Sequence, residues 1–323
     1  MGFLAVSALA VMLAAQTSFH KFRPPARAQQ LAAIGSTKEL PVTLQRAFDP
    51  SEGFQPLPKP DEIDWLANFE EKGQTFDQFV KSESRRPSAR RKRIYLQPFG
   101  GSTEAAGVSL DALRRFTSAF FMMDVVVLPP LDLSRSPIKT RQNFYSHRPQ
   151  MLTGDLLKVL YQHLPPDAFA LMGITMTDLY PGPGWNYVFG QAAPRSAVGV
   201  YSFARYDSQF FGEAPTPASR LLLLRRACKI LAHEAGHMFG IEHCIWFRCT
   251  MNGCNHLDEL DGAPLHLCPV DERKLEWSAS YDVLERYRRL RQFDRGAGLN
   301  DEADWIEQRL RFIEAGKPAR DTP

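Results

Sequence analysis

Three of the chain's eight histidines fall within one short segment, "HEAGHMFGIEHC", residues 233–244. His233 and His237 are four residues apart, so on an α-helix both imidazoles project to the same side and can bind one ion. Gly240 can adopt the left-handed conformation that ends a helix and reverses the chain, which would return His243 as a third ligand. The spacing therefore predicts a metal ion bound by two ligands on a helix and one beyond its end.

The ligand set indicates which metal and which reaction. Three neutral imidazoles suit Zn²⁺ and leave a fourth position for water, as in catalytic rather than structural zinc sites. Glu234 lies about 100° around the helix from His233, which is too far for an easy ligand but within reach of a zinc-bound water. As general base it would take the proton of that water and pass it to the leaving amine, while zinc polarises the scissile carbonyl. The chemistry predicted is zinc-dependent hydrolysis of a peptide bond.

The cysteines suggest a second metal site. The chain has five, and four of them fall between Cys244 and Cys268. Such clustering in a chain of 323 residues is typical of metal binding rather than of a disulfide framework. Cys228 stands apart, on the helix expected to carry His233, and is interpreted as a small buried thiol.

Taken with the cysteines, the histidine segment resembles the signature of the archaemetzincins, a branch of the metzincin metallopeptidases. The signature runs from the third histidine into Cys244, continues as Cys249-Thr250-Met251, and ends near the "CPVD" that starts at Cys268. The resemblance covers roughly residues 90–293 and includes "VGVYSFARY" (198–206) and "NHLDE" (255–259).

The resemblance implies a second, structural zinc held by four cysteines. Cys244, Cys249 and Cys268 occupy three of the ligand positions, and Asp271 occupies the fourth. A carboxylate also binds Zn²⁺, although it is a harder ligand than a thiolate, so we expect a second zinc with Asp271 as its fourth ligand. The alternatives are a different fourth ligand (Cys254, His256 or His266) or a segment that holds by packing without a second ion.

The resemblance also implies a fold and several roles. The fold class expected is α+β (mixed α/β), metzincin-like: a twisted sheet with backing and active-site helices above a small irregular lower subdomain. Residues 198–206 would form the cleft-facing edge strand that holds an extended peptide, and Met251 would lie beneath the metal. Tyr201 and Tyr206 are both candidates to stabilise the oxyanion. The resemblance also implies small or N-terminal substrates, and therefore an aminopeptidase-like activity.

The pattern along the chain agrees with that fold class. Strands are expected at 93–100, 124–133, 168–180 and 197–206, and helices at 109–121, 153–164 and 219–239, with Ser109 and Thr153 as N-caps. Strands that alternate with helices predict a mostly parallel sheet covered by helices. After Gly240 no regular pattern is visible for about forty residues, and two charged helices follow at 279–293 and 301–315.

Three regions are expected. Residues 1–90 form an N-terminal extension with a proline-rich linker that packs loosely, residues 91–293 form the peptidase domain, and residues 294–323 form a C-terminal amphipathic helix and tail. The apolar start is too short to span a bilayer, and residues 1–16 form only a weak signal segment because no basic residue precedes the apolar run. We expect a cytoplasmic location rather than export.

The composition limits the partners. A net charge of +3 does not indicate a polyanionic partner, and the basic run at 84–93 is interpreted as a solvated linker. We therefore expect no nucleic-acid partner. We expect a monomer that acts on peptides or small proteins. The alternative function is a zinc-containing peptide-binding or scaffold protein with low turnover. Glu234 argues against it, because a protein that only binds needs no base beside three zinc ligands.

Overall fold

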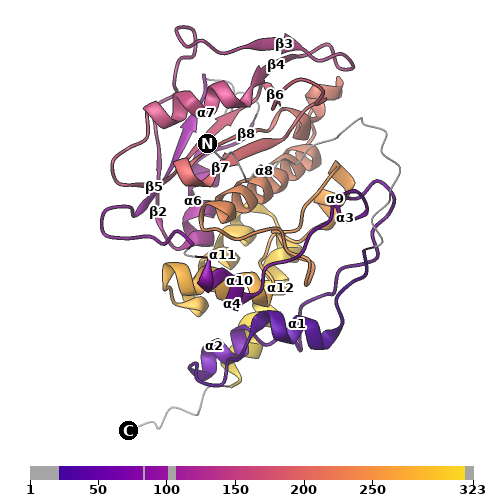
Figure 1. The fold of residues 1–323 in the computed structure, drawn as a ribbon, viewed down its shortest axis with the longest axis vertical. Coiled ribbons are helices and arrows are strands. Elements are labelled where there is room, and N and C mark those ends of the chain that lie inside the picture. The colour runs from indigo at the N-terminus through magenta and orange to yellow at the C-terminus, as the bar shows by residue number, and fades with distance from the viewer. Residues whose placement is uncertain (1–21, 83, 101–106, 317–323) are drawn as a thin grey trace.

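The computed structural model describes residues 22–82, 84–100 and 107–316, and the candidate signal segment 1–16 lies outside them. Sheets with their covering helices fill the upper half of the molecule, and helices from both ends of the chain fill the lower half (Figure 1). This is the mixed α/β architecture that the sequence predicts.

The main sheet has five strands in the order β2-β1-β5-β8-β7. β1 (Arg93–Pro98), β2 (Asp124–Val127), β5 (Ala168–Thr175) and β8 (Val198–Ser202) run parallel, as predicted, and β7 (Gly190–Ala193) pairs antiparallel with β8. The expectation that residues 198–206 form the edge strand is wrong, because β8 lies between β5 and β7. The edge strand beside β8 is β7, whose sequence "GQAA" is too short and its side chains too small to indicate a strand.

The two faces of this sheet bury alternate side chains. Ile94 and Met172 point toward α6 (Leu110–Phe121) and α8 (Pro217–Met238), whereas Tyr95 and Leu171 point toward α7 (Thr153–Gln162). All eight residues of β5 are buried, as expected for a central strand covered on both faces. α8, which carries His233 and His237, therefore rests on a rigid support.

A second sheet, which the sequence did not indicate, lies above the first. It contains β3 (Thr140–Gln142), β4 (Pro149–Leu152) and β6 (Asp178–Tyr180). The strand expected at 168–180 is broken after Thr175, and its last part joins this small sheet.

The two predicted caps differ in outcome. Ser109 caps α6, since its hydroxyl accepts a hydrogen bond from Ala112 N at 3.1 Å. Thr153 does not cap α7: Leu152 is the N-cap residue, and the Thr153 hydroxyl is buried, donating to Tyr180 O at 3.4 Å.

Helices fill most of the lower half. The segment expected to be irregular after Gly240 contains α9 (Leu257–Gly262) and α10 (Pro269–Ala279), and the two charged helices follow as α11 (Val283–Ala297) and α12 (Asn300–Glu314). Among the described residues, no helix has both the length and the apolarity needed to cross a bilayer.

The N-terminal segment is an integral part of the core, unlike the loosely packed extension that the sequence suggested. It contains α1 (Arg27–Ile34), α2 (Val42–Ala47), α3 (Trp65–Asn68) and α4 (Phe76–Lys81). Phe48 and Phe79 are fully buried and share one apolar core with residues of α8, α11 and α12. In Figure 1 this indigo segment has α2 beside α12, runs up one side of the molecule to α3 next to α9, and returns to α4 beside α10.

Candidate active site

α8 places two of the three histidines. Thr216 is its N-cap residue and accepts a hydrogen bond from Ser219 N at 3.1 Å, and Pro217 is its first residue, where a missing N–H costs nothing. The chain turns at Gly240, whose φ of +85° confirms the predicted left-handed conformation. Cys228, on the same helix, is fully buried, as predicted.

The three histidines that the sequence singled out converge. Nε2 of His233 and Nε2 of His237 are 3.1 Å apart, and the nearest ligand atoms of His233, His237 and His243 all lie within 4.8 Å of one another. The three rings come from the helix and from the loop beyond Gly240, the arrangement that the spacing predicts.

The opposite nitrogen of each ring is held by an oxygen. Nδ1 lies 2.9 Å from Thr250 O in His233, 2.6 Å from Ile241 O in His237, and 2.7 Å from a carboxylate oxygen of Glu71 in His243. Backbone carbonyls and ionised carboxylates only accept hydrogen bonds, so each Nδ1 carries the proton and each Nε2 presents a lone pair to the common centre.

This arrangement fits zinc. Two Nε2 lone pairs 3.1 Å apart repel unless a cation lies between them, and a tetrahedral ion with Zn–N bonds of 2.0–2.1 Å places its nitrogens about 3.3 Å apart. Nε2 of His243 is buried and has no hydrogen-bond partner among the described residues. Burial lowers the pKa of His233 to about 3 and the pKa of His237 well below its ordinary value. These two imidazoles are therefore neutral at pH 7, the form that binds a metal.

Sequence reasoning missed Glu71 and Trp65. The Trp65 indole donates from Nε1 to the same Glu71 oxygen at 2.9 Å, and its ring meets the His243 ring edge-on, with centroids 5.1 Å apart. Burial opposes ionisation of Glu71, but the hydrogen bond that its carboxylate accepts from His243 outweighs burial, so the pKa of Glu71 is lowered. Nothing in the sequence marks a glutamate 172 positions before the histidine that it contacts.

Glu234 is fully buried next to His233 in the chain. Burial, and after it the negative charge of Glu234, raises the pKa of Tyr201 well above its ordinary value, and Glu234 also contributes to the raised pKa of Tyr206. The Tyr201 hydroxyl donates to the sulfur of Met172 at 3.4 Å, whereas the buried Tyr206 hydroxyl has no hydrogen-bond partner among the described residues. The structure assigns the oxyanion role to neither.

Met251 lies directly against the histidine helix. A Cβ atom added at Gly236 would meet the Met251 sulfur at 2.6 Å, so the thioether occupies the space that this glycine leaves between His233 and His237. Met251 is fully buried, and its carbonyl accepts a hydrogen bond from Cys244 N at 2.8 Å. This contact connects the histidine centre to the first cysteine.

The four residues expected at a second zinc site also meet. Ligand atoms of Cys244, Cys249, Cys268 and Asp271 lie within 4.8 Å of one another, and all four residues are buried. The sulfurs of Cys244 and Cys268 are 3.6 Å apart, close to the roughly 3.8 Å that a tetrahedral ion with Zn–S bonds of about 2.3 Å requires. Oδ2 of Asp271 is 3.3 Å from the Cys249 sulfur. The donor set fits a structural zinc.

The other oxygen of Asp271 faces a cation. Lys274 Nζ is 2.8 Å from Oδ1, and both side chains are almost fully buried. Burial and the negative charge of the Cys244 thiolate raise the pKa of Asp271 to about 7. Burial also opposes ionisation of Cys244, but hydrogen bonds from Cys249 and Cys268, with the charge of Lys274, lower its pKa well below its ordinary value.

The alternative fourth ligands point elsewhere. The Cys254 thiol donates to Asn252 O at 3.6 Å, His256 pairs with Asp64 at 2.9 Å, and His266 pairs with Glu302 at 2.8 Å. All five cysteines are free thiols. Asp271 is thus the candidate that reaches the three sulfurs.

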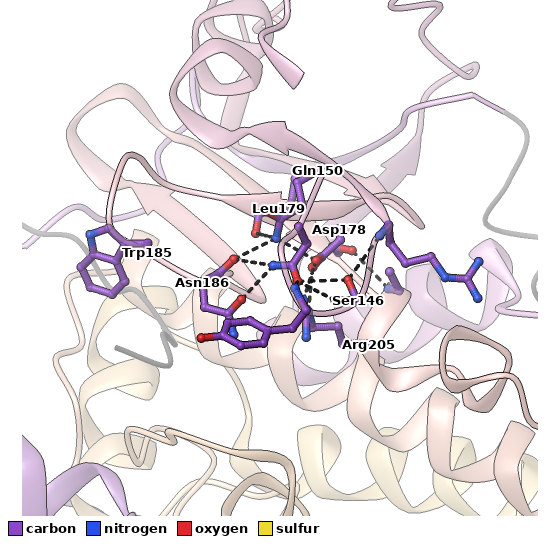
Figure 2. Close-up of polar contacts among 12 residues, drawn as sticks. Ser146, Gln150, Asp178, Leu179, Trp185, Asn186 and Arg205 are labelled. Atoms are coloured by element: carbon purple, nitrogen blue, oxygen red, sulfur yellow. Dashed lines mark hydrogen bonds and ion pairs between the residues drawn. The ribbon is translucent and has the colours of Figure 1, made fainter. Parts of the chain in front are cut away.

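A buried polar cluster fixes the loop that leads into the edge strand β7 (Figure 2). Asp178 accepts two hydrogen bonds from Arg205, at 2.9 and 2.7 Å, and one from Gln150 at 2.8 Å. Gln150 also donates to the carbonyl of Asn186 at 3.0 Å, and the Arg205 guanidinium lies 3.5 Å from the centre of the Tyr187 ring. The cluster joins the small sheet to the turn that follows β8 and holds the loop before β7 in place.

Comparison with known proteins agrees with this geometry. The model of Peptidase family M54 matches residues 126–276. Archaemetzincin-2 of Pongo abelii is 37% identical over 275 residues, which cover 76% of this chain and 76% of that protein. The chain belongs to the archaemetzincin family. It is therefore a zinc metallopeptidase, a hydrolase.

Two further proteins are similar to this chain. Archaemetzincin-2 of Homo sapiens is 36% identical, again with 76% of each chain covered. Among solved structures, a zinc-dependent peptidase from Methanocorpusculum labreanum is 25% identical with a TM-score of 0.46, over 56% of this chain and 99% of that one.

Proposed function

We propose that this archaemetzincin hydrolyses peptide bonds with His233, His237 and His243 as the ligands of the catalytic zinc and Glu234 as the general base. The observation that carries the proposal is the convergence of three Nε2 lone pairs while each Nδ1 is held by an oxygen acceptor. Three nitrogens whose lone pairs face one another would destabilise a packed core, because unshared lone pairs repel.

The chain's own residues supply the proton transfers. Zinc bound at this centre would polarise the scissile carbonyl and acidify a water molecule. Glu234, adjacent to His233, takes the proton of the attacking water and delivers it to the departing amine. The hydrogen bonds to Thr250 O, Ile241 O and Glu71 keep the three imidazoles in the tautomer and orientation that zinc needs.

We also propose a second, structural zinc held by Cys244, Cys249, Cys268 and Asp271. Asp271 would bind through Oδ2, because Lys274 occupies Oδ1. Three thiolates and a carboxylate around Zn²⁺ carry a net charge of −2, and Lys274 neutralises half of it inside the protein. Met251 and the Cys244 backbone link this site to the catalytic one.

The proposed substrates are peptides or small proteins, from which the enzyme removes N-terminal residues. The proposed active form is a monomer, without a nucleic-acid partner. The alternative is a peptide-binding protein with low turnover. The two differ in whether Glu234 matters, since only catalysis needs the base.

The test compares a proteome-derived peptide library after incubation with wild-type protein and with Glu234→Gln, read by mass spectrometry. Glu242→Gln, the same change at an exposed glutamate, is the matched control. Products formed by wild type and the control but not by Glu234→Gln, with equal zinc in all three, support the proposal, and the product ends show whether cleavage is terminal. Equal products from all three would refute the role of Glu234. No products from wild type would favour the binding alternative.

A further inference from the structure

We infer that Glu71, in the segment that precedes the proposed peptidase domain, is a positioning residue for the catalytic zinc and acts through His243. The inference rests on the proposed role of His243 as a zinc ligand. It makes the N-terminal segment part of the metal centre rather than an appendage to it.

His243 differs from the other two histidines in how it is held. His233 and His237 are fixed by α8, and backbone carbonyls accept their Nδ1 hydrogen bonds. His243 lies in the irregular segment beyond Gly240, and its Nδ1 partner is a side chain, 2.7 Å away. The ring of His243 therefore depends on Glu71 for the orientation that the helix gives the other two.

Glu71 is itself held in place. The Trp65 indole donates to its Oε1 at 2.9 Å, and the Trp65 ring stacks on Phe69 with centroids 4.1 Å apart. The backbone N–H of Trp65 donates to Glu259 at 3.0 Å, which anchors this part of the segment to α9. The carboxylate is thus presented to His243 from a fixed position.

The same segment also clamps the turn that carries His243. Gln74 donates from Nε2 to Gly240 O at 3.1 Å and accepts from Glu242 N at 3.3 Å. Gln74 is buried, and a Cβ at Gly73 would lie 2.5 Å from the Ile245 side chain, so the two chain segments are in close contact. The residues on both sides of His243 are therefore held by the segment that bears Glu71.

A carboxylate that accepts the Nδ1 hydrogen bond of a zinc-binding histidine fixes its tautomer and makes Nε2 a stronger donor to the metal. Loss of such an outer partner typically lowers metal affinity or activity by about 10–100-fold. A residue that only fastened the N-terminal segment would affect the stability of the fold but not the intrinsic affinity for zinc.

The test measures zinc affinity of the full chain by competition with a chelator, in wild type, Glu71→Ala, Glu71→Gln and Glu70→Gln. Glu70 is the exposed neighbour and provides the matched control. His243→Ala shows how much zinc remains when the catalytic centre is lost, so that any zinc at the cysteine site can be subtracted. Urea unfolding of the zinc-free variants reports structural damage separately.

We expect Glu71→Ala to weaken zinc binding by about 10–100-fold and Glu71→Gln, which keeps a neutral acceptor, by a smaller factor of about 3–10, with Glu70→Gln unchanged. The inference is overturned if the zinc affinities of both Glu71 variants lie within twofold of wild type. It is also overturned if unfolding of the variants fully accounts for their loss of zinc affinity. If Glu71→Ala does not fold, Glu71→Gln decides by the same criteria. Wild-type zinc binding in His243→Ala would instead refute the proposed ligand set.

Discussion

The contact between Gly236 and Met251 allows a quantitative test of how the helix sits on the turn beneath it. We predict that Gly236→Ala destabilises the protein, although alanine is the better helix former. A Cβ at position 236 would lie 2.6 Å from the Met251 sulfur and 3.0 Å from its terminal methyl carbon. Non-bonded heavy atoms prefer about 3.5–4.0 Å, so the sulfur would have to move by about 1 Å within a fully buried site.

Two terms of opposite sign set the size of the effect. Overpacking of this kind costs about 1–3 kcal/mol, and replacing glycine by alanine inside a helix recovers about 1 kcal/mol. The net loss expected is therefore about 0–2 kcal/mol. When Met251 is first replaced by alanine, the clash is gone, and Gly236→Ala should then stabilise by up to about 1 kcal/mol.

The assay is a double-mutant cycle by urea unfolding of wild type, Gly236→Ala, Met251→Ala and the double variant, all at the same excess of zinc. The free energies of unfolding should show a favourable coupling of about 1–3 kcal/mol between the two substitutions. Gly154→Ala, in α7, is the matched control, because a Cβ there meets nothing within 4 Å. Additive effects of the two substitutions would refute the argument that Met251 occupies the space above Gly236.

Two further predictions concern other buried groups. Burial and the charge of Glu302 raise the pKa of Asp294 to about 8. The carboxyl of Asp294 stays protonated in the folded state, whereas the unfolded chain releases this proton above pH ~4, so wild type should lose stability as the pH rises from about 4 to 8. In urea unfolding, Asp294→Asn should be more stable than wild type by a few kcal/mol at pH 9 and should differ little from wild type near pH 4.5. An equal difference at both pH values would contradict this. Zinc analysis of purified protein should give two equivalents in wild type and one in Cys249→Ser, while Asp271→Cys, which supplies a fourth thiolate, should hold the second ion more tightly against a chelator. One equivalent in wild type, unchanged in Cys249→Ser, would remove the second site.

The histidine centre could be predicted because its main parts are close in sequence. His233 and His237 are adjacent on any helix, and Gly240 needs only its own backbone conformation to return His243. The parallel sheet could also be predicted from the sequence, since its central strands are continuous apolar runs separated by amphipathic helices. In each case the signal is local.

The missed features depend on distant contacts or on weak local signals. Glu71 gains its role only from a partner 172 residues away. β7 is four small or polar residues that pair because β8 presents an open edge, not because of their own propensity. The N-cap residues of α9 and α10 are His256 and Cys268, neither of which is a usual N-cap residue, so the sequence did not indicate where these helices start.

The path of the N-terminal segment also has a consequence for how the protein folds. Its contacts with the turn after α8 join residues 166 to 216 positions apart, from Gln74–Gly240 to Gln30–Trp246. Long chain separations slow folding, because the loop must close before the contact contributes any energy. During synthesis these early residues cannot reach their final partners until the chain has emerged beyond Trp246, so we expect the contact that orients His243 to form late.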